Sequence, residues 1–236
     1  MAITALQRDL LARLQANYTD GLTSAEAAQR RNRDGSSNGG MNNVRPPLNC
    51  PKWICCLLPC INHIPSMKTF RLVQPDDAEV LRDGKWIRYD HASLVVGDVV
   101  RLVEGDVVPA DCTVISLGMD HVDATTVVDE ESNAKTGIEN LEITIDSHLI
   151  TGETKPRQIS NQPNGTVDSK TLYYGSRLLE GACIAVVTAT GNRVVLAKLI
   201  REGRWPPPTD LSEEVEEINR MENEDMEAGI ALTLMS

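Results

Sequence analysis

The chain has 236 residues, of which 41% are hydrophobic, so it can bury the core of one moderate-sized domain and still carry additional segments. Aromatic residues make up only 3%, so we expect valine, leucine, isoleucine and alanine to build that core. The formal net charge of −11 argues against a nucleic-acid-binding protein, because such a protein should present a basic face.

The composition also bears on the compartment. The sequence contains no run of about 18 apolar residues, the minimum for a spanning helix. Charged residues interrupt the N-terminal apolar stretch "MAITALQRDLLARLQ", which argues against a secretory signal. Without such a signal, six cysteines favour free thiols over a disulfide framework. We therefore expect a cytoplasmic chain or one at the cytosolic face of a membrane.

The first part of the chain, residues 1–43, is predicted to be a helical segment. Apolar residues at helical spacing predict an amphipathic helix over 3–16, and capping residues predict a second helix over 22–31. The glycine, serine and asparagine residues of 33–43 then predict a flexible loop that ends helical structure.

A linker rich in cysteine and proline, which we expect to be irregular, follows over 44–67. It contains a cluster of candidate metal ligands: Cys50, Cys55, Cys56, Cys60 and His63. Thiolates and imidazole suit zinc, but the spacing is not the paired C-x₂-C type. Acylation of Cys55 or Cys56 is the second interpretation, since both lie in an apolar patch. Free thiols with no ligand are the interpretation we favour.

Residues 68–203 are predicted to form a β domain, with strands from residue 68 onward. Asp83-Gly84 lies between two short strand-like runs and indicates a two-residue hairpin. Further strands are expected in four segments: 93–117, 141–146, 171–190 and 193–196. A helix is expected over 196–203. Many short strands separated by turn residues favour a mainly β fold, a β-sandwich or distorted jelly roll with flanking α-helices.

Two strongly polar segments accompany this domain. Residues 118–140 are acidic and are predicted to be an inserted loop; His121 and its carboxylate neighbours lack the ligand order of an EF-hand, so a solvated loop is favoured over a metal site. Residues 204–236 form an acidic C-terminal segment, in which a helix over 210–228 is expected to be solvated.

The stretch "LITGETKP" places an acidic residue at a turn, after an apolar run that has the composition of a buried strand. Gly152 allows the backbone to bend sharply, and Pro156 prevents an easy continuation of regular structure. The sequence therefore predicts a tight loop that presents the Glu153 carboxylate to something outside the domain.

Four segments in a fixed order carry a resemblance to a known family. They are "GLTSAEAAQRRNRDG" (21–35), "VGDVVRLVEGDVVPAD" (96–111), "IDSHLITGETKP" (145–156) and "YYGSRLLEGACIAVVTATGN" (173–192). Together they resemble the N-terminal cation-ATPase segment and the actuator (E1-E2 ATPase) domain of P-type cation-transporting ATPases. The resemblance covers roughly 70–202 and a short N-terminal piece. Departures are Ile150 in place of the usual leucine, Thr154 in place of serine, and the insertion at 118–140.

The resemblance implies a role for the Thr-Gly-Glu (TGE) loop. In the family, its glutamate activates the water that hydrolyses an aspartyl phosphate carried on a separate domain, promoting dephosphorylation. By this match Glu153 activates the water, while Thr151, Gly152 and Thr154 shape the loop. The alternative is an ordinary exposed glutamate in a turn.

The resemblance also shows what this sequence lacks: no Asp-Lys-Thr-Gly-Thr motif, no nucleotide-binding domain and no spanning helices. We expect no cofactor in this chain, with ATP and Mg²⁺ required only with those domains. The expected partners are the phosphorylation and transmembrane domains of a pump, in cis for a fragment or in trans for a stand-alone chain. The N-terminal segment favours a pump for protons, other monovalent cations or calcium.

A different reading is a non-enzymatic regulator derived from such a domain, or a membrane-associated scaffold; in that case the chain would contact a membrane surface or another protein.

The aspartates of "EGDVVPAD" carry no catalytic assignment: Gly105-Asp106 is interpreted as a turn whose carboxylate binds nearby backbone N–H groups, and Pro109 as a strand edge.

Overall fold

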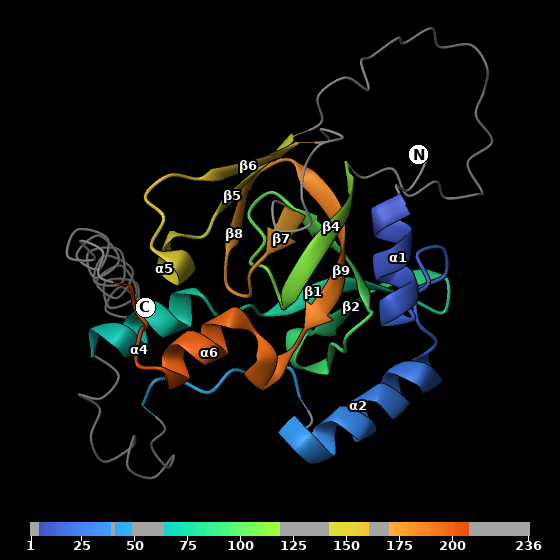
Figure 1. The fold of residues 1–236 in the computed structure, drawn as a ribbon, viewed down its shortest axis with the longest axis horizontal. Helices are drawn as coiled ribbons and strands as arrows, with labels where there is room; N and C mark the ends of the chain where they lie inside the picture. The colour runs from blue at the N-terminus through green and yellow to red at the C-terminus, as the bar shows by residue number, and fades with distance from the viewer. Residues whose placement is uncertain (1–4, 39–40, 49–63, 119–141, 161–169, 208–236) are drawn as a thin grey trace, which may run out of the picture.

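The computed structural model describes most of the chain and contains two antiparallel β-sheets with flanking helices (Figure 1). The described residues are 5–38, 41–48, 64–118, 142–160 and 170–207. The predicted mainly β fold is therefore confirmed. None of the helices in these ranges combines the length and apolar character that crossing a membrane requires.

The larger sheet has six strands in the order β2-β1-β3-β9-β4-β7, and the smaller has three in the order β6-β5-β8. The larger sheet comprises β1 (Asp77–Arg82), β2 (Lys85–Asp90), β3 (Val99–Val103), β4 (Asp111–Leu117), β7 (Thr171–Leu172) and β9 (Ala182–Ala189). The smaller sheet comprises β5 (Glu142–Asp146), β6 (Arg157–Ser160) and β8 (Arg177–Glu180). The predicted hairpin at Asp83-Gly84 is confirmed: it joins β1 to β2, which pair from Arg82 and Lys85 outward.

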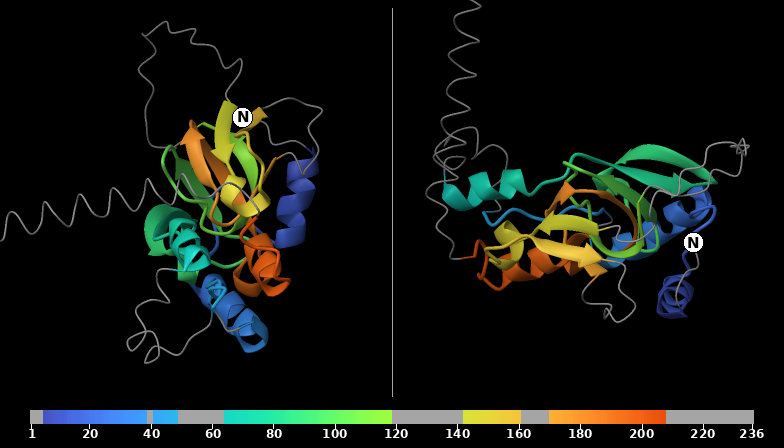
Figure 2. Two further views of the ribbon diagram at one scale, coloured as in Figure 1. Left: turned by 90° about the vertical axis from the view of Figure 1, so that its left-hand side faces the viewer. Right: turned by 90° about the horizontal axis from the view of Figure 1, so that it is seen from above.

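The helices lie around this sandwich. They are α1 (Ala5–Leu14), α2 (Ser24–Asn38), α4 (Pro65–Leu72), α5 (His148–Thr151) and α6 (Val195–Arg201), with 3₁₀ turns at His91–Ser93 and Gly191–Arg193. Helices α4, α5 and α6 gather at one end of the molecule, whereas α1 lies against the larger sheet (Figures 1 and 2).

The main core lies between the two sheets, because strand residues alternate between the two faces of a sheet. On β9, Ala185 and Val187 face the smaller sheet, which contributes Ile143, Ile145 and Leu178 to the same buried cluster. Their neighbours on β9 turn to the opposite face, where helix α1 covers part of the sheet with Leu10 and Leu11. β4 is buried along its whole length because both of its faces are covered. Aliphatic residues dominate this core, as the composition predicts.

A buried ion pair fixes the start of β3. Asp98 is fully buried and accepts two hydrogen bonds from the guanidinium of Arg82 on β1, at 3.0 Å from Nε and 2.6 Å from Nη2. The same carboxylate accepts the backbone N–H of Val95 at 2.8 Å. Asp98 is the first aspartate of the Gly-Asp pairs in the sequence, and its role in the structure is to join β1 to the turn before β3.

Several local predictions are wrong at their boundaries. Helix α2 continues to Asn38, where a loop was predicted from residue 33, since the cost of a glycine in a helix is only about 1 kcal/mol. Helix α4 begins at Pro65, inside the linker predicted to be irregular, and occupies 68–72, where strands were predicted. Proline suits the first turn of a helix, and Phe70 is buried on one face of α4.

Two predicted strands are helical instead. Residues 193–196 fall in a 3₁₀ turn and the start of α6, and the apolar run before Gly152 forms α5. Short apolar runs do not distinguish a buried helix from a buried strand, because both bury most of their side chains. The predicted helix at 196–203 is confirmed by α6, and the strand predicted at 141–146 is confirmed by β5.

Other predictions fall outside the described residues. They are the cysteine cluster with His63, all of the 118–140 insertion except Gly118, and the acidic helix at 210–228. In the described ranges, Cys112 and Cys183 are buried free thiols, and burial raises the pKa of both, so they stay protonated. No group of three or more histidine, cysteine or acidic residues in these ranges is arranged to hold a metal ion.

The buried ion pair generates a prediction about stability. Replacing Asp98 with alanine leaves the Arg82 charge buried without its partner, so we expect the free energy of unfolding to fall by about 3–5 kcal/mol. Chemical denaturation followed by circular dichroism measures this loss. The matched control is Asp77→Ala, which removes an exposed pair with Arg88 at 3.3 Å and should cost less than about 1 kcal/mol. Equal losses in the two variants would contradict the assignment.

Candidate functional site

The Thr-Gly-Glu sequence forms a sharp turn at the end of α5. The N–H of Thr151 donates to the carbonyl of Ser147, and the N–H of Gly152 donates to the carbonyl of His148, both at 2.8 Å. Gly152 then ends the helix in the left-handed region at φ 77°, a conformation that glycine adopts without steric cost. The chain therefore reverses direction immediately before Glu153.

The residues after this reversal are directed toward solvent. Glu153, Thr154, Lys155 and Pro156 are all exposed, and β6 begins at Arg157. Within the described ranges, no hydrogen bond or ion pair engages the Glu153 carboxylate. The turn thus leaves this carboxylate accessible, whereas the backbone that precedes it is fixed by helical hydrogen bonds.

Two polar contacts hold the first turn of α5. The hydroxyls of Ser147 and Ser176 lie 2.9 Å apart in a buried position, which joins α5 to the residue before β8. Asp146 accepts the N–H of His148 at 2.9 Å and also contacts the Nδ1 of that histidine at 2.7 Å. Both contacts bind the helix start to the smaller sheet, since Asp146 is the last residue of β5.

A buried apolar layer packs against α5. Ile150 is only 2% exposed and packs into a buried cluster at the end of the sandwich where α4 and α6 lie. The other buried members are Val44, Phe70, Val73, Tyr174, Val194, Leu196, Ala197 and Trp205. Gly175 must be glycine here: a Cβ would lie 2.7 Å from the Val73 carbonyl oxygen, and its φ is 85°. Glu153 in the turn is exposed, whereas Ile150, three positions earlier in the sequence, is buried and anchors the turn.

Asp111, the last residue of "GDVVPAD", joins the sheet to this layer. Its carboxylate accepts the N–H of Tyr174 at 2.9 Å and the N–H of Val195 at 2.8 Å, so it caps the start of α6. Burial raises the pKa of Asp111 to about 6, against the opposing effect of these two hydrogen bonds. The structural interpretation of the motif therefore holds, and Asp106 likewise accepts the N–H of Val103 at 2.9 Å.

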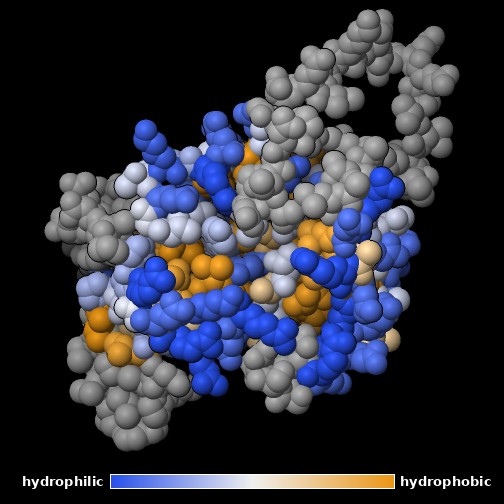
Figure 3. All heavy atoms as spheres, in the orientation of Figure 1, coloured by the Kyte–Doolittle hydropathy of each residue, from blue (hydrophilic) through white to orange (hydrophobic). Residues whose placement is uncertain are grey.

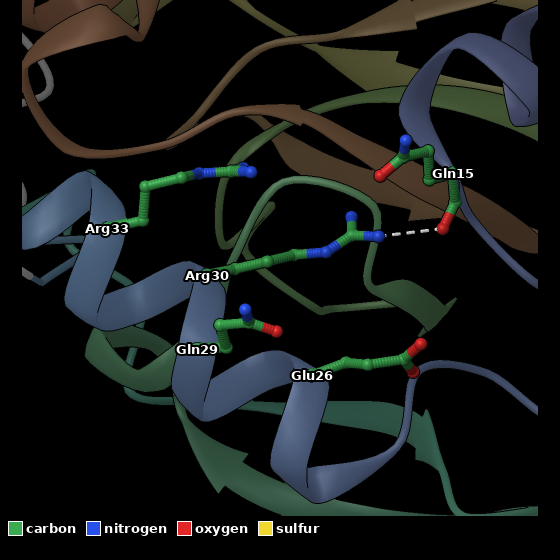
Figure 4. A pocket seen from close by; sticks show the side chains of 5 residues that line it. All are labelled: Gln15, Glu26, Gln29, Arg30 and Arg33. Atoms are coloured by element: carbon green, nitrogen blue, oxygen red, sulfur yellow. Dashed lines mark hydrogen bonds between the residues drawn. The ribbon is translucent and has the colours of Figure 1, made fainter.

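A separate hollow of about 390 Å³ lies between the end of α1 and helix α2 (Figure 4). It is lined by Gln15, Glu26, Gln29, Arg30 and Arg33. The Arg30 guanidinium is already engaged, because it donates to the carbonyls of Leu14, Val96 and Gln15 at 2.7–2.9 Å. This side chain therefore acts as a structural link between α1, α2 and the β domain. No residue of the Glu153 turn lines the hollow.

The surface offers no single large apolar face in the view of Figure 3, where hydrophilic side chains surround smaller apolar patches. The exposed large apolar side chains of the described ranges are Met41, Leu48, Ile64, Ile87 and Leu179.

Sequence reasoning missed the residues that hold the turn. Trp205 donates its indole N–H to the Leu149 carbonyl at 2.7 Å, yet in the sequence it stands more than fifty positions away, after a helix. Phe70 and Ser176 were missed as well. The available signal was weak: Trp205 is one of three tryptophans in a chain with 3% aromatic residues, and three prolines follow it directly.

Comparison with known proteins is consistent with the resemblance stated above. A family model described as P-type ATPase actuator domain matches residues 72–132. The human sodium/potassium-transporting ATPase subunit alpha-3 is 28% identical over 138 residues, covering 56% of this chain and 11% of that protein. A probable proton ATPase 1A of Leishmania donovani is 37% identical over 110 residues, covering 47% of this chain and 10% of that protein.

The chain thus spans about a tenth of the length of the curated relatives it matches. Among solved structures, a zinc-transporting PIB-type ATPase in the E2.Pi state aligns with a TM-score of 0.40 at 16% identity, covering 63% of this chain and 20% of that one.

The buried carboxylate of Asp111 generates a pH prediction. Its pKa is raised from 3.8 to about 6 in the folded state, so its contribution to stability is full below about pH 4 and is lost as the pH rises through 6. Replacing Asp111 with asparagine removes this titration. The unfolding free energy of the natural chain, relative to Asp111→Asn, should therefore fall by at most about 3 kcal/mol between pH 4 and 7.

Urea denaturation of both proteins at several pH values measures this difference. Asparagine keeps one acceptor oxygen but places N–H groups toward a backbone donor, which adds a constant cost independent of pH. A difference that does not change between pH 4 and 7 would mean that Asp111 titrates normally, contrary to its burial.

Proposed function

The chain contains an actuator domain of the P-type ATPase kind, and from this premise we propose that it promotes dephosphorylation of an aspartyl phosphate. The phosphate would be carried on a phosphorylation domain that this sequence does not include. Glu153 would enter that site and activate the attacking water. The observation that carries the proposal is the exposed, unengaged Glu153 carboxylate at the end of a well-anchored turn.

The chemistry requires one carboxylate and one water. The water oxygen attacks the phosphorus atom, the bond between phosphorus and the aspartyl oxygen breaks, and the aspartate leaves as a carboxylate. The proton of the attacking water passes to Glu153, which must lie within hydrogen-bond reach of that water. Inorganic phosphate is the product. In this scheme Thr151, Gly152 and Thr154 shape the loop and do not take part in proton transfer.

The structure of the turn supports this scheme in two ways. The backbone before Glu153 is held by hydrogen bonds and by buried Ile150, so little ordering is needed when the loop meets its partner. The carboxylate itself has no described partner that it would have to leave. A rigid support with a free acidic side chain is the arrangement that docking onto an acyl phosphate requires.

The partners follow from the same proposal. The phosphorylation and membrane-spanning domains of a pump would supply the acyl phosphate, ATP and Mg²⁺, either in the same polypeptide or in another. The domain would then work at the cytosolic face of a membrane. Because the relatives named above include sodium/potassium-transporting and proton ATPases, we propose a monovalent cation as the transported ion.

The test uses a pump of the sodium/potassium-transporting type whose own loop glutamate has been changed to glutamine. The pump is phosphorylated with radiolabelled ATP, and decay of the phosphoenzyme is followed as the full 236-residue chain is added. We expect the natural chain to accelerate decay and Glu153→Gln to reduce that acceleration about 100-fold, since glutamine cannot accept the proton.

The matched control is Glu104→Gln, the same substitution at an exposed position in another turn, which should leave the acceleration unchanged. If Glu153→Gln accelerates decay as well as the natural chain does, the proposed role of this carboxylate is wrong. Acceleration that is lost in both variants would instead point to a general charge effect.

A further inference from the structure

Trp205 contacts the Glu153 turn from a segment far away in the sequence. The indole Nε1–H donates to the Leu149 carbonyl at 2.7 Å, and the residue is only 6% exposed. Leu149 lies inside α5, a helix of four residues that ends at Thr151. Its carbonyl has no following helical amide to accept from, so the indole takes the place of the missing backbone donor.

The tryptophan ring is itself held firmly. It packs edge-to-face on Phe70 of α4, with ring centroids 6.1 Å apart and planes at 84°. It also belongs to the buried cluster that contains Ile150. The indole thus reaches α5 from a fixed position between α4 and α6.

A second contact from the same segment is made at Gly152, the residue directly before Glu153. A Cβ built on Gly152 would lie 3.1 Å from the Cβ of Pro207, so this proline packs over the glycine of the turn. Residues 205–207 therefore touch the turn at two backbone positions, the Leu149 carbonyl and Gly152.

The path of the chain explains how the segment reaches the turn. After α6, the N–H groups of Glu202 and Arg204 donate to the carbonyls of Lys198 and Leu199, both at 2.9 Å, and these bonds close the helix. The chain then folds back toward α5, at the end of the molecule where α4, α5 and α6 gather (Figures 1 and 2).

We propose that Trp205 is a positioning residue for the Glu153 turn and acts through its hydrogen bond to Leu149. The bond fixes the last turn of α5, and the last turn of α5 fixes the direction in which Glu153 leaves the domain. The effect on phosphate release rests on the proposed function, whereas the effect on the order of the turn does not.

The experiment is amide hydrogen exchange on the full chain with Trp205→Phe, which keeps an aromatic ring against Phe70 but lacks the N–H donor. We expect the amides of Ile150, Thr151 and Gly152 to exchange about fivefold faster, because one intramolecular hydrogen bond is lost. Amides of β3 and β9 should exchange at their original rates. The matched control, Trp86→Phe on β2, should leave the turn unchanged.

Unchanged exchange in the turn of Trp205→Phe would overturn the proposal. Faster exchange that extends over β3 and β9 would overturn it as well, because Trp205 would then serve the core as a whole. In the phosphoenzyme assay, we expect Trp205→Phe to lower the maximal rate severalfold with the half-saturating concentration unchanged. If the natural chain shows no acceleration, the proposed function fails, and the exchange result still decides the role of Trp205.

Discussion

The buried carboxylate of Asp111 connects the two halves of this structure. Through it, β4 accepts backbone N–H groups from Tyr174 and from Val195 at the start of α6. Tyr174 belongs to the apolar layer on which Ile150 rests, and Val195 lies between two other members of that layer, Val194 and Leu196. The sandwich therefore transmits its rigidity to the end of the molecule where the Glu153 turn lies. This connection places a carboxylate in the interior. Burial disfavours its charged form and therefore raises the pKa of Asp111 to about 6.

The apolar layer needs a buried side chain and the turn needs an exposed one, and the sequence supplies both within four residues. Ile150 is buried and Glu153 is exposed, and Gly152 between them reverses the chain at φ 77°. A residue with a Cβ at 152 would meet both an unfavourable backbone conformation and Pro207. This glycine thus separates a structural half of the loop from a half that is free to meet a partner.

The buried pair of Arg82 and Asp98 performs a comparable task at the opposite side of the larger sheet. It joins β1 to the turn before β3, and Arg30 joins α1 and α2 to the same region through backbone carbonyls. Charged groups here stabilise connections between elements and leave apolar residues to fill the core between the sheets. An acidic chain with few aromatic residues can in this way build a compact sandwich from aliphatic side chains.

The sequence by itself determined the mainly β fold, the hairpin at Asp83-Gly84 and helix α6, because alternation, turn residues and helical spacing are local properties. It also singled out the exposed turn at Glu153, since glycine and proline mark sharp bends wherever they occur. Only the tertiary structure decided that the apolar run before Gly152 is a helix and that Trp205 and Phe70 support it. Those contacts join residues far apart in the chain, and their hydrogen bonds and packing depend on the folded path, which no local pattern encodes.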